Sequence, residues 1–212
     1  MLRLPNILTI LRILLVPVFA VTYALPGTTA RLIAFTIFCI AGLSDALDGL
    51  AARKLHASSD FGRMLDPIAD KILVAVALMM LVAEGNIRQF TLERGLHSLL
   101  LLVPALVILT REILVSGLRE FLAGAAVSLP VTAISKAKTT IQMIAIGAMI
   151  LEPLARHTLP EGLALSYSTA AYTGLWVAAG LTVYTGYVYF RAGIAHLHPN
   201  RATSPPAAGG GA

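Results

Sequence analysis

The chain has 212 residues, of which 57% are hydrophobic and only 13% charged, and its mean hydropathy is +0.81. So few charges cannot cover the surface of a water-soluble domain, which excludes an ordinary soluble enzyme and indicates a chain surrounded largely by lipid. The formal charge of +5 would suit a nucleic-acid partner, but basic residues flanking membrane spans explain it better, and we expect no nucleic-acid binding.

Six apolar runs are each long enough to cross the hydrocarbon core of a bilayer, which takes roughly 20 helical residues. They cover residues 6–25, 32–53, 62–84, 96–118, 134–154 and 166–190. Turn-forming residues separate them, such as Pro26-Gly27 and Pro160-Glu161-Gly162. The sequence therefore predicts an all-α integral membrane bundle of six transmembrane helices. It forms one domain over residues 1–198, and residues 199–212 are expected to be a disordered tail.

Charge is distributed unevenly between the two sides that six spans would create. The side with both termini carries Arg3, Arg53, Lys54, Arg63, Arg119, Lys136, Lys138, Arg191 and Arg201. The opposite side carries Arg31, Arg88, Arg94 and Arg156, offset by Glu84, Glu93, Glu152 and Glu161. The positive-inside rule makes the first side cytoplasmic, so we expect a multi-pass protein of the cytoplasmic (inner) membrane with both termini in the cytoplasm.

Four aspartates, Asp45, Asp48, Asp66 and Asp70, lie near the facing ends of the second and third runs. Acidic groups at membrane depth are costly and usually serve a function. Asp45 and Asp48 are three residues apart, and Gly62, Asp66 and Asp70 follow at intervals of four, so each set shares one helix face. Because the connection is short, the two helices are antiparallel neighbours, and their acidic faces can converge near the cytoplasmic surface.

Several carboxylates in one place repel one another, and divalent cations relieve that repulsion. Hard oxygen ligands suit Mg²⁺, Mn²⁺ or Ca²⁺, and two such ions could hold a diphosphate while a phosphorus–oxygen bond breaks. Gly49 and Gly62 leave room for a ligand, and Arg53 offers a planar fork to a phosphate. The alternative is that the acids cap helices or pair with nearby cations. Asp60 fits that alternative as an N-cap, but two aligned acidic faces do not.

These residues resemble the signature of the CDP-alcohol phosphatidyltransferase family, D-x2-D-G-x2-A-R-x8-G-x3-D-x3-D. The chain reads Asp45-x2-Asp48-Gly49-x2-Ala52-Arg53-x8-Gly62-x3-Asp66-x3-Asp70, without a departure.

The resemblance implies a role for each position of this signature. Asp45, Asp48 and Asp66 would bind two divalent ions, Mg²⁺ or Mn²⁺, with Asp70 completing the second site and acting as the general base. The lipid substrate would be CDP-diacylglycerol, held by Gly49, Arg53 and Ser59. We add Gly62, Asn6 and Thr9 to this lipid site, the last two because they share a helix face with Arg12. Family members are commonly homodimers, so a homodimer is expected.

Three further stretches resemble the family members whose acceptor is glycerol 3-phosphate. They are residues 4–12, 110–119 and 135–142, where Ser135 replaces a usual glycine. Arg111, Arg119, Lys136 and Lys138 are expected to bind the acceptor's phosphate. Inositol phosphate would need the same cations, so it stays open as an acceptor. The two lysines could equally be flanking charges of a membrane span.

Two other functions fit parts of the pattern. A membrane prenyl-transfer enzyme also uses aspartates and Mg²⁺, but would release diphosphate in place of CMP. A cation transporter with a carboxylate site would move metal across a membrane and need no CDP-lipid.

Overall fold

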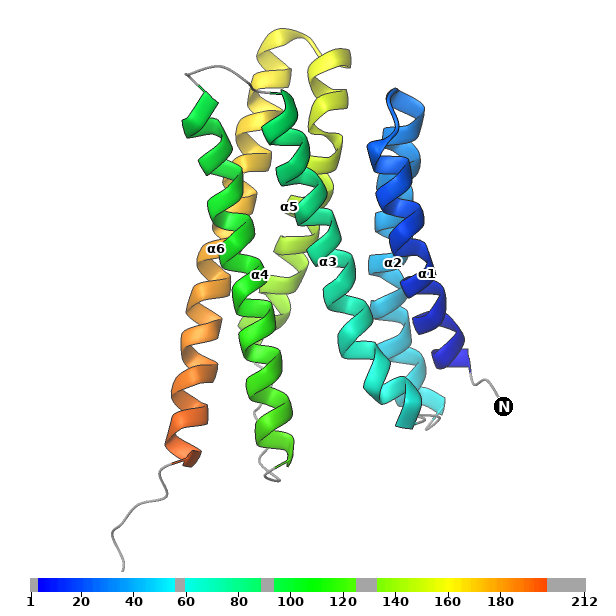
Figure 1. The fold of residues 1–212 in the computed structure, drawn as a ribbon, viewed down its shortest axis with the longest axis vertical. Coiled ribbons are helices and arrows are strands. Elements are labelled where there is room, and N and C mark those ends of the chain that lie inside the picture. The colour runs from blue at the N-terminus through cyan, green and yellow to red at the C-terminus, as the bar shows by residue number, and fades with distance from the viewer. Residues whose placement is uncertain (1–3, 56–59, 89–93, 125–132, 198–212) are drawn as a thin grey trace, which may run out of the picture.

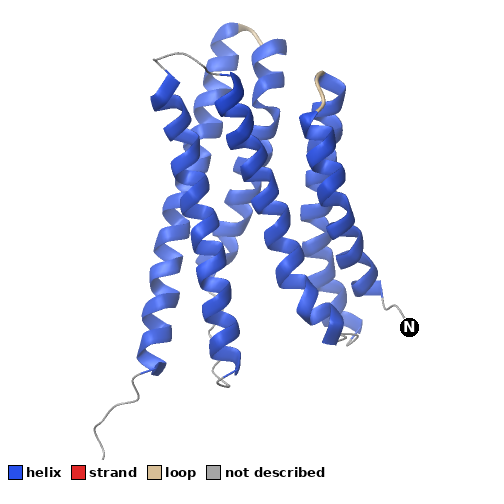
Figure 2. Ribbon diagram, in the orientation of Figure 1, coloured by secondary structure: helices blue, strands red, loops and turns tan. Residues whose placement is uncertain are grey.

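The computed structural model describes residues 4–55, 60–88, 94–124 and 133–197, and all regular structure within these ranges is helical (Figure 2). The helices are α1 (Leu4–Ala24), α2 (Thr28–Leu55), α3 (Asp60–Arg88), α4 (Arg94–Gly124), α5 (Ala133–Thr158) and α6 (Glu161–Leu197). The six helices expected from hydropathy are confirmed. Five of the expected runs lie inside the observed helices, and the first passes the end of α1 by one residue.

The helices run alternately up and down the long axis of the molecule (Figure 1). At the lower end of that view lie the first residues of α1, the end of α2, the start of α3, the end of α4, the start of α5 and the end of α6. The end of α1, the start of α2 and the end of α3 lie at the upper end, as does the turn from α5 to α6. The aspartate-bearing ends of α2 and α3 are therefore at the lower end.

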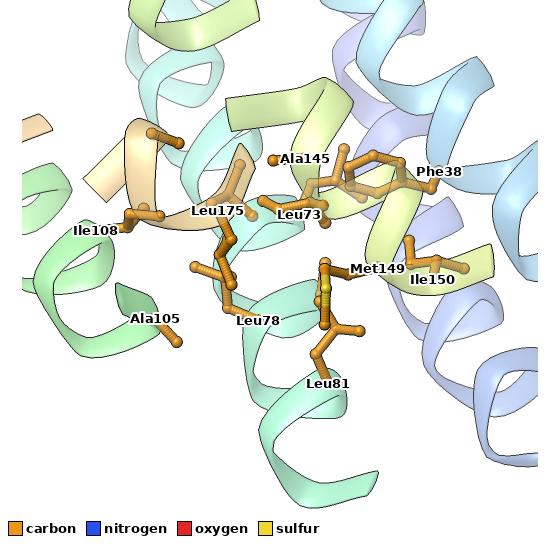
Figure 3. Close-up of a cluster of buried hydrophobic side chains, with 14 of the residues drawn as sticks. Phe38, Leu73, Leu78, Leu81, Ala105, Ile108, Ala145, Met149, Ile150 and Leu175 are labelled. Atoms are coloured by element: carbon orange, nitrogen blue, oxygen red, sulfur yellow. The ribbon is translucent and has the colours of Figure 1, made fainter. Parts of the chain in front are cut away.

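A continuous apolar core joins the helices (Figure 3). Helix α1 packs on α2 and α3, α4 packs on α3 and α6, and α5 packs on α6 and α2. The side chains at the centre are fully buried or nearly so, including Phe38, Leu78, Ile108, Met149 and Leu175. Burial of one such side chain contributes roughly 1.5–3 kcal/mol when the alternative is exposure to water.

A glycine of α2 leaves room for a side chain of α5. A Cβ added at Gly42 of α2 would lie 2.5 Å from Cε of Met143 on α5, closer than carbon atoms can pack. The missing side chain of Gly42 therefore gives space to the end of the Met143 side chain where α2 packs on α5. Gly27 serves a different purpose: its φ of 104° lets the chain turn between α1 and α2.

A proline in α4 is compensated by a side chain of α6. Pro104 lies inside α4 and has no N–H, so the carbonyl of Leu100, one turn earlier, has no helical donor. The indole Nε1 of Trp176 donates to that carbonyl at 2.9 Å. The bond satisfies a backbone group and fixes α6 against α4.

The outer surface carries many large apolar side chains. Leu114, Ile144 and Leu165 are 66%, 67% and 70% exposed. Within the described residues, two stretches are long and apolar enough to cross a membrane, Leu99–Gly124 and Ile134–Thr158, and Thr9–Ala24 and Thr28–Ser44 are shorter apolar helices. Exposed apolar surface on this scale suits contact with lipid.

Candidate active site

The eight motif residues occupy the facing ends of two neighbouring helices. Asp45 and Asp48 lie in the last turns of α2, while Asp66 and Asp70 lie in the first turns of α3, and the two helices pack on each other. The side chains of the eight motif residues and of Asn6 lie outside the described residues, as does Ser59 altogether. The convergence of the four carboxylates therefore stays a prediction, made from helix register and from the common end of the bundle.

Two described residues directly beside the aspartates, one on each helix, are buried. Ser44 is 9% exposed and donates to the carbonyl of Ile40 at 2.7 Å, and Ala69 of α3 is fully buried. On α1, which packs against both helices, Thr9 and Arg12 are each 1% exposed. Thr9, which is expected at the CDP-lipid site, thus points into the bundle together with Arg12, while its contact with a ligand stays a prediction.

The donor set decides whether divalent metal fits. Among the described side chains, no three His, Cys, Asp or Glu residues form a group, and the four aspartates lie outside that set. Their chemistry is that of hard carboxylate oxygens at helix spacing, which fits Mg²⁺ or Mn²⁺ and not a soft metal.

A second polar site joins α4, α5 and α6. Glu112 of α4 accepts a hydrogen bond from Nη1 of Arg111 at 3.1 Å and also pairs with Nζ of Lys138 on α5. Nη2 of Arg111 donates to Oγ1 of Thr185 on α6 at 3.0 Å. The side chains of Arg111 and Lys138 are only 13% and 3% exposed. Lys138 is therefore an internal cation and not a solvated charge flanking a span.

One tyrosine connects the remaining members of this site. Nη2 of Arg119 and Oγ of Ser135 donate to Oη of Tyr189 at 3.2 and 3.3 Å. The guanidinium carbons of Arg119 and Arg111 lie 5.1 and 5.8 Å from the centre of its ring, within the range of cation–π attraction. Lys136 is exposed and makes no side-chain contact of this kind within the described residues.

Three of the four cations expected at an acceptor phosphate therefore belong to one network, which we call the cationic network: Arg111, Glu112, Arg119, Ser135, Lys138, Thr185 and Tyr189. Sequence reasoning missed Thr185 and Tyr189. The one sequence feature that could have indicated them is their spacing of four residues, which places both on one face of a helix. The many apolar residues around them make that face hard to recognise.

Residues 2–184 match the family model of the CDP-alcohol phosphatidyltransferases. The chain belongs to that family. It is 40% identical over 190 residues to the CDP-diacylglycerol–glycerol-3-phosphate 3-phosphatidyltransferase of Rickettsia bellii, covering 90% of this chain and 94% of the relative. The protein of the same name from Pseudomonas fluorescens is 37% identical over 92% of both chains. That of Salmonella paratyphi A is 40% identical over 71% of this chain and 78% of its own.

At the upper end, far from the aspartates, this phosphatidyltransferase has a polar cluster that sequence reasoning treated only as separate flanking charges. Glu84 of α3 accepts from Nη1 of Arg31 on α2 at 3.1 Å and from the hydroxyl of Tyr23 on α1. The Arg31 guanidinium lies 4.2 Å from the centre of the Tyr23 ring. We call these three residues the upper cluster. It ties three helices together beside a cavity of about 660 Å³.

Proposed function

We propose that this phosphatidyltransferase transfers the phosphatidyl group of CDP-diacylglycerol to glycerol 3-phosphate, giving phosphatidylglycerophosphate and CMP, a step of phospholipid biosynthesis. The observation that carries the proposal is the match to relatives of three bacterial genera that are named for this activity, at 37–40% identity. The intact eight-residue signature supports the CDP-lipid half of the reaction, and the cationic network supports the acceptor half.

The aspartates and their neighbours form the proposed CDP-lipid site. Asp45, Asp48, Asp66 and Asp70 hold two divalent ions, Mg²⁺ or Mn²⁺. When bound, such ions neutralise the charge of a diphosphate and of the departing phosphate oxygen. The CDP-lipid is held by Asn6, Thr9, Gly49, Arg53, Ser59 and Gly62. The two glycines leave space for the substrate, and the Arg53 guanidinium suits a phosphate oxygen pair.

In the proposed reaction, Asp70 takes the proton of the acceptor's hydroxyl group. The hydroxyl oxygen forms a bond to the phosphorus that carries diacylglycerol. The bond from that phosphorus to the bridging oxygen breaks, and CMP leaves with the bridging oxygen. A carboxylate is a weak base for an alcohol, so the proton moves as the new phosphorus–oxygen bond forms and not before it.

Charge balance supports a phosphate-bearing acceptor. Counted over the described side chains alone, the cationic network contains three cations, Arg111, Arg119 and Lys138, and one anion, Glu112, a net of two positive charges. The phosphate of glycerol 3-phosphate is close to a dianion at neutral pH and would match this excess. Lys136, exposed near the start of α5, adds a further positive charge at the same end of the bundle. Serine or choline would gain nothing from these charges.

We further propose that all six helices cross the cytoplasmic membrane, with both termini and the active site on the cytoplasmic side. The excess of basic residues near the lower end supports this orientation. Residues 1–198 would form one catalytic domain, and the enzyme would act as a homodimer, which cross-linking in isolated membranes would test.

The deciding experiment is CMP release by the purified enzyme with CDP-diacylglycerol and Mg²⁺, offered glycerol 3-phosphate, inositol phosphate or serine in parallel. CMP with glycerol 3-phosphate alone is expected. Release of CMP with another acceptor would refute glycerol 3-phosphate as the acceptor. Release of diphosphate, or metal flux without CMP release, would refute phosphatidyl transfer as the reaction.

A further inference from the structure

Helix α6 is the element that connects the two helices carrying the acceptor cations. Within the described residues α6 packs against both α4 and α5, whereas α4 and α5 have no close backbone contact with each other. Arg111 and Arg119 lie on α4, and Lys136 and Lys138 lie on α5. Apart from the ion pair between Glu112 of α4 and Lys138 of α5, the relative placement of these cations therefore depends on the contacts that α6 makes with both helices.

One face of α6 makes those contacts. Tyr189 lies four residues after Thr185 and three after Gly186, so these three residues lie on the same side of the helix. Thr185 is 2% exposed and accepts from Arg111, and it donates to the carbonyl of Leu181 at 2.9 Å. A Cβ added at Gly186 would lie 3.0 Å from Cγ of Arg111, so the stem of this arginine rests on the α6 backbone.

Tyr189 completes the face. It is 5% exposed, and its hydroxyl oxygen is the shared acceptor of Arg119 from α4 and of Ser135 from the first turn of α5. Ser135 precedes Lys136 by one residue and Lys138 by three. The tyrosine thus holds one arginine directly and fixes the helix start from which both lysines project.

We infer that this face of α6, formed by Thr185, Gly186 and Tyr189, positions the acceptor cations for a phosphate group. The inference rests on the proposed function. Tyr189 acts as a positioning residue: it holds Arg119 and the start of α5, and it affects the acceptor through them. Its loss should weaken recognition of the phosphate-bearing acceptor without changing the CDP-lipid site or the chemical step.

The main test is Tyr189→Phe, which removes the hydroxyl and keeps the ring. Tyr184→Phe is the matched control, because Tyr184 lies on the same helix and is 54% exposed. CMP release should show a KM for glycerol 3-phosphate raised about tenfold in Tyr189→Phe, as expected for a lost hydrogen bond from a charged donor. The kcat and the KM for CDP-diacylglycerol should match those of Tyr184→Phe.

A second pair of variants tests the same face without touching the tyrosine. Gly186→Ala places a methyl group against the stem of Arg111 and should raise the same KM several-fold. Gly180→Ala is its control, since a Cβ there meets nothing within 4 Å. Thermal unfolding midpoints of all four variants show whether each is folded.

Inorganic phosphate, used as a competitor at constant free Mg²⁺, separates failure of this inference from failure of the proposed acceptor. Its inhibition constant should rise in Tyr189→Phe and Gly186→Ala whichever phosphate-bearing alcohol the wild-type enzyme uses. The inference is overturned if phosphate does not compete, if both variants behave like their controls, or if kcat and both KM values worsen together.

Discussion

Glu84→Gln is expected to weaken the upper end of the bundle while sparing the chemistry. The Arg31 and Glu84 side chains are only 10% and 18% exposed, and Glu84 also accepts from Tyr23. The amide removes the negative charge and leaves a buried guanidinium without its counter-ion. Removing one member of a buried ion pair costs about 3–5 kcal/mol, and the residual exposure of both partners places this pair near 3 kcal/mol.

This loss of stability corresponds to a measurable fall in the thermal unfolding midpoint. For a chain of this size, each kcal/mol of lost stability lowers the midpoint by about 2–4 °C. The midpoint of Glu84→Gln should therefore fall by about 6–12 °C. Far-ultraviolet circular dichroism in detergent micelles would measure it. Glu161→Gln is the control, because Glu161 is an exposed acid in the first turn of α6 at the same end, where its loss should cost less than about 1 kcal/mol.

A double variant sharpens the experiment. Arg31→Gln with Glu84→Gln leaves no isolated charge, so it should lose less stability than the two single changes added, with a coupling of about 1–3 kcal/mol. The kcat of Glu84→Gln should stay at the wild-type value, because the aspartates lie at the other end of the helices. The assigned role of the upper cluster would be refuted if Glu84→Gln had the same midpoint as Glu161→Gln. It would also be refuted if the double variant lost as much stability as the two single variants added together.

Three other predictions concern the active site. Asp70→Asn should lower turnover at least about 100-fold while CDP-diacylglycerol binding stays measurable, and wild-type turnover would remove Asp70 from the role of base. Lys138→Gln should raise the KM for glycerol 3-phosphate roughly 10-fold or more, and Lys136→Gln much less, because only Lys138 is buried in the cationic network; equal effects would contradict that difference. Chelation should abolish CMP release until Mg²⁺ or Mn²⁺ is restored, whereas full activity in chelator would exclude a metal requirement.

Hydropathy located the six helices because each contains a long apolar stretch, and such stretches stand out in a chain with few charges. The helix ends were less predictable. The sixth apolar run was expected over residues 166–190, whereas α6 extends from Glu161 to Leu197, because a helix continues past scattered charged residues such as Arg191 for as long as its backbone hydrogen bonds are satisfied. Hydropathy reports which residues avoid water and does not report where a helix ends.

The partners of the polar side chains were harder to predict than the helices. Local spacing predicts that Asp45 and Asp48 share one helix face. Arg111 and Thr185, by contrast, are 74 residues apart and meet only through the packing of α4 on α6. Lys138 shows the same limit: in sequence it is indistinguishable from Lys136, and the two differ only because the turn of α5 directs one inward.

The bond from Trp176 to the Leu100 carbonyl gives this enzyme a built-in optical reporter. Trp176 is the only tryptophan of the chain, so intrinsic emission excited at the indole band comes from the junction of α4 and α6 alone. The same two helices carry Arg111 and Tyr189 further along their length. Any shift of α6 against α4 when a phosphate-bearing acceptor binds would change the hydrogen bonding of that indole, and could be followed by fluorescence without a label.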